Sequence, residues 1–317
     1  MTAFTIISDY CYENHDTGGD DHPENARRLK VINDALVSQK RYSSLSFVKP
    51  RPADRNSLLA VHSESWLFRF EEAVLSGKTY IDHPDNQICF DTYDVAMLSA
   101  GAGLTAIDLI ENGQANNVFC LVRPPGHHAE EKTPFGFCFF NNCVIAARYW
   151  QNKYKRKRVL VFDFDAHHGN GIQSAFEEEA GAMYISIHEH PSFSYPGTGY
   201  TDETGIGKGK GSILNVALQP GEGDEKVKEK LEKKILPQIQ KFQPEAIIVA
   251  AGFDAHIKDY MSGLHYSTEL YHTLGETVKG WATQFTGGKI LSILEGGYEL
   301  SVLGESVAAY VDGLLIE

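Results

Sequence analysis

The sequence predicts an α/β protein built on a central, mostly parallel β-sheet. Short apolar, β-branched runs recur along the chain, and each ends in Gly, Pro, Asp or His. Helical patterns separate many of these runs, as the crossovers between parallel strands require. The runs are apolar throughout rather than alternating, which is typical of strands covered by helices on both faces. The length of 317 residues, without an internal repeat or a long linker, favours one domain over residues 1–317.

Seven runs are expected to form strands, and they lie at 4–8, 117–122, 158–164, 182–188, 213–218, 246–252 and 289–297. Apolar residues recur with helical spacing in three long segments between them, at 96–113, 226–242 and 271–285. The basic run KYKRKR at 153–158 directly precedes a strand, so we interpret it as a solvated connection.

Composition narrows the classes of function. A formal net charge of −13 argues against binding nucleic acid through a broad basic surface, and it suits cationic partners such as lysine-rich tails or polyamines. The five cysteines form no CxxC, and their odd number argues against a disulfide framework. No signal peptide is evident, and no apolar run approaches the roughly 20 residues that span a bilayer. A cytoplasmic enzyme without a membrane segment is the expectation, and the oligomeric state stays open.

Polar, reactive residues follow four of the predicted strands. These are RPPGHH after 117–122, DFDAHHGNG from 163, GFDAH after 246–251 and EGGY after 289–294. Ligand sites of open α/β sheets lie beyond the carboxyl ends of the strands, so the four groups are expected to meet at one edge. Neighbouring histidines diverge on a strand or helix, and two such pairs therefore favour loops that aim both rings into one site.

A metal site is predicted within these segments. Asp165 and His167 are two residues apart, so both side chains leave one face of an extended segment. Asp254 is the candidate third ligand. One His and two Asp leave a position open for water, which fits a catalytic zinc, while Fe(II), Co(II) and Mn(II) also accept such a set.

Six motifs occur in a fixed order: RPPGHHA, GFCFFNN, DFDAHHGNG, YPGTG, GFDAH and EGGY. In order and spacing they resemble the zinc-dependent histone deacetylase superfamily. The resemblance is greatest to its class II branch, with the bacterial histone-deacetylase-like amidohydrolases and acetylpolyamine amidohydrolases, and it covers residues 21–317. It implies the arginase–deacetylase fold with eight parallel strands. Arginases hold two manganese ions with further carboxylates, whereas here those positions are Gly169 and His256, so one metal ion is expected.

The resemblance also implies a set of catalytic residues. His127 and His128 match the tandem pair that acts as general base and acid, with Asp163 beside His127 and Asn170 beside His128. A neutral partner leaves His128 the better base, and that role is assigned to it. Tyr298 matches the tyrosine whose hydroxyl donates to the developing oxyanion. Class IIa deacetylases, which are weak on acetyl-lysine, carry histidine there, so Tyr298 predicts a competent deacetylase.

Further positions are implied around this centre. Gly136 and Phe137 match one wall of the acyl tunnel, Tyr195 stands where the family usually has Phe, and Met261 where it usually has Leu. Arg28 matches an arginine that lines a product exit. The acidic segment 81–94 is expected at the rim, where it supplies Asp82, Asp85, Asp91 and Asp94, and Asp91 and Asp94 are the substrate-binding candidates. A potassium site is implied by main-chain carbonyls around a group of five residues, Asp163, Asp165, His167, Ser186 and Ile187.

The expected reaction is removal of acetyl, or longer acyl, groups from N-acyl-lysine side chains by metal-activated water. The alternative is an acetylpolyamine amidohydrolase that acts on small acetylated polyamines. Acidic residues at the rim favour the polyamine reading, while the class II-like context of GFDAH and YPGTG favours acyl-lysine. A metal-binding scaffold without turnover is disfavoured, because the ligands, both histidines and Tyr298 are all retained.

Overall fold

The computed structural model describes residues 4–316 except 20, 39–41 and 44. Its centre is an eight-stranded sheet in the order β2-β1-β5-β10-β9-β6-β7-β8, and every neighbouring pair is parallel. The strands are β1 Thr5–Ile7, β2 Ser46–Val48, β5 Asn117–Cys120, β6 Val159–Asp163, β7 Ala182–Glu189, β8 Ile213–Leu218, β9 Ala246–Ala251 and β10 Ile290–Leu294. The predicted α/β class, with a parallel sheet of eight strands, is therefore confirmed.

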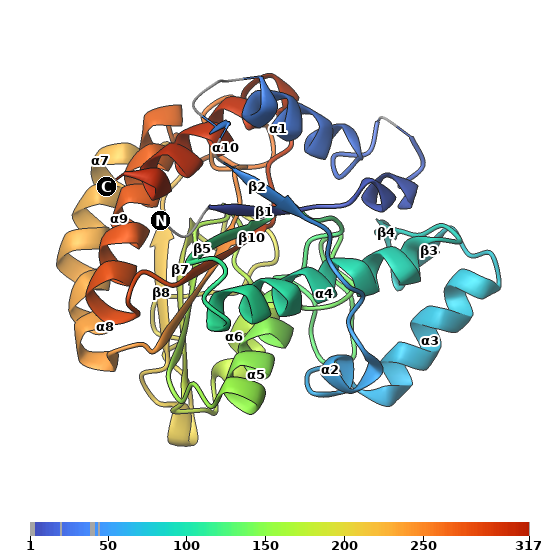
Figure 1. Cartoon of the computed structure of the whole chain (residues 1–317), viewed down its shortest axis with the longest axis horizontal. Helices are drawn as coiled ribbons and strands as arrows, with labels where there is room; N and C mark the ends of the chain where they lie inside the picture. Colours follow the sequence, from blue (N-terminus) through green and yellow to red (C-terminus); the bar gives the residue numbers. More distant parts are fainter. Residues whose placement is uncertain (1–3, 20, 39–41, 44, 317) are drawn as a thin grey trace.

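Helices cover both faces of this sheet (Figure 1). They are α1 Arg27–Val37, α2 Arg55–Leu59, α3 Glu64–Leu75, α4 Thr92–Glu111, α5 Asn142–Tyr154, α6 Asn170–Phe176, α7 Asp224–Lys230, α8 Leu236–Phe242, α9 Thr268–Phe285 and α10 Leu300–Leu315, with short helices η1 Tyr10–Asn14 and η3 Gly207–Gly209. Helices α1, α9 and α10 pack together on one side, and α4 packs on α5 on the other. Such double cover explains why the strand residues of β5, β6, β7 and β9 are buried on both faces.

Several elements differ from the expected bounds, among them α4, which begins at Thr92, and in two cases local contacts explain the difference. Helix α9 begins three residues before 271, because the Ser267 hydroxyl accepts a hydrogen bond from Leu270 N and caps the helix. The segment 226–242 is not one regular α-helix, since a π-helical turn, η4 Leu231–Ile235, separates α7 from α8. Pro237 follows that turn and has no N–H to donate to the preceding turn, which accounts for the change of helical register.

Strand β2 and a small hairpin were not predicted, because neither has an apolar run in its sequence. Strand β2 has three residues, none of them buried, at the edge of the sheet. The hairpin pairs β3 Tyr80–Ile81 with β4 His83–Gln87 in antiparallel fashion, with Asp82 at a φ of 62° in the turn. It lies beside α3 at the periphery (Figure 1). A second hydrophobic core beneath it includes the stacked rings of Trp66, Phe70 and Phe139.

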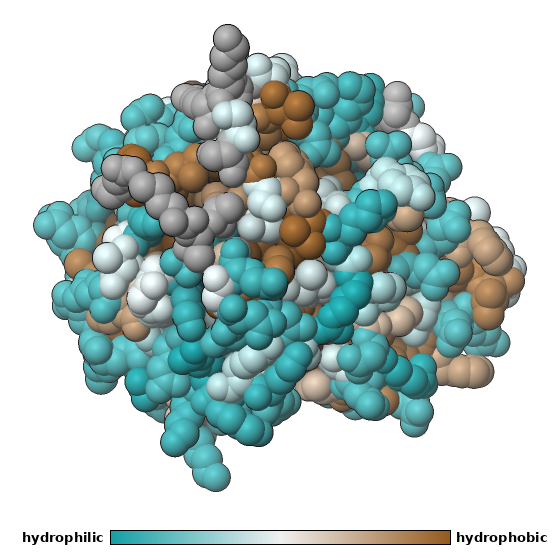
Figure 2. Space-filling model, viewed as in Figure 1, coloured by the Kyte–Doolittle hydropathy of each residue, from teal (hydrophilic) through white to brown (hydrophobic). Residues whose placement is uncertain are grey.

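Helix α4 is the one described helix with the length and hydropathy of a membrane span, which the sequence reading did not anticipate. Its most apolar window has a mean hydropathy of 1.3, and 61% of that window is buried inside the protein. The helix packs on α5 and β5, so its apolar character is that of a core helix. On the face shown in Figure 2, hydrophilic residues predominate and hydrophobic residues form separate patches.

The strand order brings the reactive segments together. Strands β5, β10, β9 and β6 are consecutive neighbours in the sheet. They are the four strands whose carboxyl ends lead into the histidine, aspartate and tyrosine motifs. The predicted convergence at one edge of the sheet is confirmed by this order.

Candidate active site

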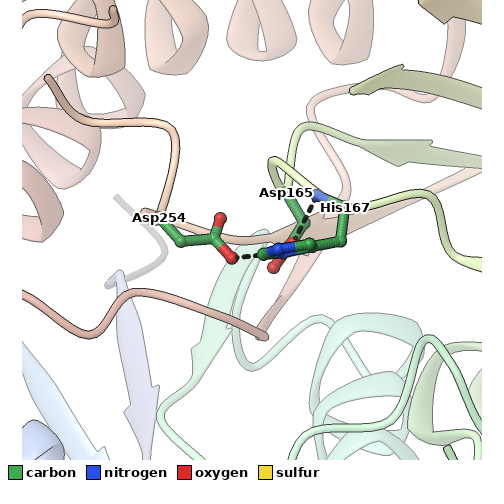
Figure 3. A group of neighbouring side chains, drawn as sticks. All are labelled: Asp165, His167 and Asp254. Carbon is green, nitrogen blue, oxygen red and sulfur yellow. Dashed lines mark hydrogen bonds and ion pairs between the residues drawn. The ribbon is translucent and has the colours of Figure 1, made fainter. Parts of the chain in front are cut away.

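Asp165, His167 and Asp254 form a buried cluster at the carboxyl edge of the sheet (Figure 3). Their ligand atoms all lie within 4.8 Å of one another. His167 Nδ1 is 2.9 Å from Asp254 Oδ2 and 3.2 Å from Asp165 Oδ1. Asp165 and His167 come from the loop after β6, and Asp254 from the loop after β9. The structure thus brings together the three residues that the sequence predicted as metal ligands.

The donor set of this cluster fits a divalent cation. His167 Nε2 lies 3.2 Å from the carbonyl oxygen of Met261, which can only accept, so Nε2 carries the hydrogen of a neutral ring. The Nδ1 lone pair of the neutral ring then faces two carboxylates, and this repulsion is relieved by a proton on Nδ1 or by a metal cation bound between the three groups. Burial alone would lower the pKa of His167, yet the two carboxylates raise it well above its usual value.

Backbone N–H groups hold the carboxylates of Asp165 and Asp254, and two glycines leave the space that these carboxylates occupy. Asp165 Oδ2 accepts from Gly296 N at 2.7 Å, and Asp254 Oδ1 accepts from Ala166 N at 2.9 Å. A Cβ atom on Gly296 would lie 2.4 Å from Asp254 Oδ2, and one on Gly252 would lie 2.1 Å from Asp165 Oδ2. These two positions therefore accept only glycine while the carboxylates keep their places.

The surroundings hold no second set of metal carboxylates among the described residues, where this cluster is the one group of three metal-ligating side chains found. A Cβ on Gly169 would lie 2.6 Å from Tyr184 Oη and 2.7 Å from Asp163 Oδ2, so a larger side chain has no room there. His256 Nε2 is 3.2 Å from the Thr268 hydroxyl instead of facing the cluster. The geometry fits one ion.

The rings of His127 and His128 lie beside the cluster of Asp165, His167 and Asp254, and their centroids are 3.9 Å apart. Their Nδ1 atoms have different partners: Asp163 Oδ2 at 3.1 Å for His127, and Asn170 Oδ1 at 2.8 Å for His128. Asp163 is itself held by the Tyr184 hydroxyl, which donates to the same oxygen at 2.9 Å.

This difference in partners separates the two histidines electrostatically. Burial would lower the pKa of His127, but the charges of Asp165 and Asp163 raise it to about 10. Burial and the neighbouring His127 lower the pKa of His128 well below its usual value. One ring is thus stabilised as a cation and the other as a neutral imidazole, and the assignment of His128 as the general base stays a prediction.

Glu295, which the sequence reading did not single out, fixes the backbone of the histidine loop. Its fully buried carboxylate accepts from Gly126 N at 2.7 Å and from His127 N at 3.1 Å. Burial raises the pKa of Glu295 to about 7. Glu295 is the first residue of the EGGY motif, and this position could have marked it as a functional candidate in the sequence.

A cavity of about 290 Å³ leads to this centre, and its lining comprises Asp85, His128, Gly136, Phe137, His167, Tyr195, Met261 and Tyr298. The Tyr195 ring meets His128 edge-on at 5.1 Å, and Phe137 meets Tyr298 edge-on at 5.9 Å. All four residues predicted as tunnel walls are in this lining. The aromatic walls leave a narrow, mainly apolar passage.

Phe137 stands in an unusual backbone conformation that the small hairpin supports. Its φ is 68° and that of Gly136 is 50°, where a Cβ would lie 2.4 Å from the His128 ring. Phe137 N donates to the side-chain oxygen of Asn86 at 3.0 Å, and Asn86 Nδ2 donates to Pro134 O at 3.2 Å. Asn86, on β4, was missed because its polar strand carries no recognisable pattern.

Tyr298 is buried opposite Phe137 and its loop is held by Asp259. The Asp259 carboxylate accepts from Tyr298 N at 2.7 Å and from Glu299 N at 2.9 Å. Gly297, at a φ of 122°, provides the turn that a residue with a side chain would adopt only with strain. Nothing in the sequence marked Asp259 for this role.

Arg28 is fully buried and anchors the same loop. Its Nε donates to Gly297 O at 2.6 Å and its Nη2 to Glu295 O at 2.5 Å, while Nη1 pairs with Glu24 at 3.2 Å. The guanidinium also lies 5.0 Å from the Tyr298 ring. These contacts give Arg28 a structural function, and its place in a product exit stays a prediction.

The structure places neither of the two predicted rim aspartates in the cavity lining. Asp91 and Asp94 are exposed at the start of α4 and are absent from the cavity lining, where Asp85 stands instead. Carboxylates at a helix start complement the helix dipole, which explains their location. The segment 81–94 contains several aspartates, and the conformation of the hairpin places Asp85 in the lining of the cavity.

The predicted potassium position is not tested by these contacts. Asp163 and Ser186 are register partners on β6 and β7, and the Ser186 hydroxyl lies 2.7 Å from His188 Nδ1. The potassium site, including Ile187, stays a prediction.

Comparison with known proteins agrees with this architecture. The family model described as "Histone deacetylase domain" matches residues 22–314. The chain is 37% identical to "Histone deacetylase 14, chloroplastic" of Arabidopsis thaliana, over 93% of this chain and 73% of that protein. It is 34% identical to the "Histone deacetylase-like amidohydrolase" of Pseudomonas aeruginosa, over 89% of this chain and 73% of that protein.

Two further matches bear on substrate and fold. "Polyamine deacetylase HDAC10" of Danio rerio is 36% identical, over 91% of this chain and 43% of that protein. The crystal structure of the HDA15 HD domain superposes with a TM-score of 0.92 at 31% identity, covering 99% of this chain and 90% of that one. With a matching family model over almost its whole length and a shared fold, this chain belongs to the histone deacetylase family.

Proposed function

We propose that the protein is a zinc-dependent deacetylase that removes acetyl, and longer acyl, groups from N-acyl-lysine side chains. One observation carries this proposal: an apolar cavity ends at His128, His167 and Tyr298, directly beside the cluster of Asp165, His167 and Asp254. An alkyl stem with a terminal amide matches such a cavity, because only its far end is polar.

The three clustered residues would hold Zn²⁺, which supplies a Lewis acid that polarises a carbonyl and makes water more acidic. The protein's own groups then complete the chemistry. His128, neutral beside Asn170, accepts the proton of the attacking water through Nε2. His127, kept cationic by Asp163, donates a proton to the departing amine. The Tyr298 hydroxyl donates to the carbonyl oxygen as negative charge develops on it.

Acyl-lysine is favoured over polyamines by the mouth of the cavity. A polyamine carries several positive charges, and recognition of each would call for a carboxylate nearby. Asp85 is the one acidic residue in the lining. A single carboxylate suits the backbone N–H groups of a peptide. The similarity to a polyamine deacetylase supports the second candidate, an acetylpolyamine amidohydrolase.

The deciding experiment compares kcat/KM for an acetyl-lysine peptide with kcat/KM for N-acetylputrescine and acetylspermidine. A preference for the peptide is expected, and a strong preference for either polyamine would overturn the acyl-lysine assignment. Longer acyl-lysines, tested in the same assay, show whether the cavity beside Met261 accepts larger acyl groups, since the flexible methionine side chain can change its conformation to make room. Rates in K⁺ and in Na⁺ buffers test the predicted potassium site.

A further inference from the structure

Glu130 lies directly behind the partner of His128. Asn170 Nδ2 is 2.9 Å from Glu130 Oε1 and 3.3 Å from the carbonyl oxygen of His128. On its other side, Asn170 Oδ1 is 2.8 Å from His128 Nδ1. A chain of contacts thus runs from the Glu130 carboxylate through one amide group to the catalytic ring.

These contacts determine which way the amide points. A carboxylate and a backbone carbonyl can only accept hydrogen bonds, so the amide atom that faces both must be the NH₂ group. Turning the amide over would set its oxygen against two acceptors. The Asn170 oxygen is therefore fixed towards His128, where it can only accept.

The orientation of the amide in turn determines the tautomer of His128. With an acceptor at 2.8 Å, Nδ1 must carry the hydrogen, and the lone pair of the neutral ring lies on Nε2. That nitrogen is the one left to act as a base. The His128 carbonyl oxygen, at 3.3 Å from Asn170 Nδ2, favours the same orientation of the amide, and Glu130 strengthens this preference with a carboxylate acceptor at 2.9 Å.

Glu130 exerts this effect from outside the substrate cavity. It is half-buried and lines a separate surface cleft of about 490 Å³ together with Glu131, Lys132 and Arg148. It is absent from the lining of the substrate cavity. Its backbone is held independently, since Glu130 N donates to Thr133 O and Glu130 O accepts from His62.

We propose that Glu130 is a positioning residue that sets the tautomer of His128 through the side-chain amide of Asn170. This inference rests on the proposed role of His128 as the base. Glu130 does not touch the substrate, so its loss lowers kcat and leaves KM unchanged.

The test compares Glu130→Met, which keeps the bulk and lacks an acceptor, with Glu130→Gln, whose amide oxygen can still accept from Asn170. We expect kcat on an acetyl-lysine peptide to fall about tenfold in Glu130→Met, since a buried donor loses its partner, and to stay near wild type in Glu130→Gln. Glu131→Met is the matched control, because Glu131 lines the same cleft and its side chain is exposed and pairs with Lys132.

A second readout reports the tautomer without turnover. In protein labelled with ¹⁵N-histidine, the two ring nitrogens of His128 differ in chemical shift, and His128→Asn identifies the signals. We expect protonated Nδ1 in the wild type and in Glu130→Gln, and a mixture of tautomers in Glu130→Met, in zinc-loaded and metal-free protein alike.

Wild-type kcat and an unchanged His128 spectrum in Glu130→Met would overturn the proposal. Equal impairment of Glu130→Gln and Glu130→Met would also overturn it, because the charge rather than the acceptor would then matter. Glu130→Ala serves as the acceptor-free variant if Glu130→Met lowers the melting temperature. A wild type that shows the expected tautomer and its loss in Glu130→Met, yet hydrolyses no acetyl-lysine, would refute the proposed function and leave the positioning role standing.

Discussion

The floor and the mouth of the cavity are built differently. At the floor, Asp165, Asp254 and Asp163 have no exposed surface, and backbone N–H groups or buried hydroxyls hold their oxygens. At the mouth, Tyr195 is 43% exposed, and the flanking Phe193 and Tyr260 are more than 60% exposed. The floor is therefore rigid and intolerant of substitution, while the mouth can change its contacts with little effect on the fold. With the proposed function, the floor would carry out the chemistry and the mouth would select the substrate.

The largest effect is expected from the floor, on removing the metal or one of its ligands. Chelation should abolish hydrolysis of an acetyl-lysine peptide, and added Zn²⁺ should restore it. Asp254→Asn should bind zinc much more weakly, because a neutral amide replaces a carboxylate, and this can be measured by metal analysis after dialysis. Asp94→Asn, on the exposed start of α4, is the control. Full turnover by metal-free enzyme would contradict the zinc assignment.

Tyr298→Phe removes one hydroxyl from the floor. We expect kcat to fall about 10²- to 10³-fold, because the developing oxyanion loses a donor. Zinc content and melting temperature should be unchanged, since Tyr298 is held by its backbone and its ring. A variant with wild-type kcat would show that the oxyanion is stabilised elsewhere.

The free energy of unfolding of the protein is expected to depend on the buried carboxylate of Glu24. Burial alone would raise the pKa of Glu24, but Arg123 and Arg28 hold it well below its usual range. Because the folded-state pKa is depressed, its stabilisation is complete above the usual pKa of about 4.3 and is lost as pH falls through the folded-state value.

Glu24→Gln should therefore lower the free energy of unfolding at pH 7 by about 3–5 kcal/mol, because two buried arginines lose their counter-ion. Denaturant titrations at pH 7 and at pH 3 provide the measurement. The difference between variant and wild type should shrink at the lower pH. A constant difference at both pH values would mean that packing, rather than charge, is responsible.

The smallest effect is expected at the mouth. Asp85→Asn should raise KM for an acetyl-lysine peptide several-fold and leave kcat unchanged. The expected size is about that of one charge-assisted hydrogen bond lost at a partly exposed site. Acetylated free lysine, which lacks peptide neighbours, should respond less. A large fall in kcat would erase the distinction drawn between mouth and floor.

The same distinction explains what the sequence could predict. The floor was predictable because its residues directly follow buried, apolar strands, and β5, β10, β9 and β6 carry such runs. The mouth was predictable only in part: Asp85 was one of four rim aspartates in the segment 81–94, and nothing distinguished it or Asn86, because both lie on a polar hairpin. Asp259 and Glu130 were missed for another reason: each acts on a neighbour's backbone or amide, and no residue pattern records a contact made across loops.

The close packing of Gly252 and Gly296 against Asp165 and Asp254, the two candidate metal-ligating aspartates, has a practical consequence for protein engineering. Any side chain at Gly252 or Gly296 would collide with a ligand oxygen, so libraries that diversify these positions would return mostly inactive clones. Randomising the exposed loops that carry Phe193 and Tyr260 would leave this packing intact. Directed evolution of new acyl or leaving-group preferences should therefore sample those loops and keep both glycines constant.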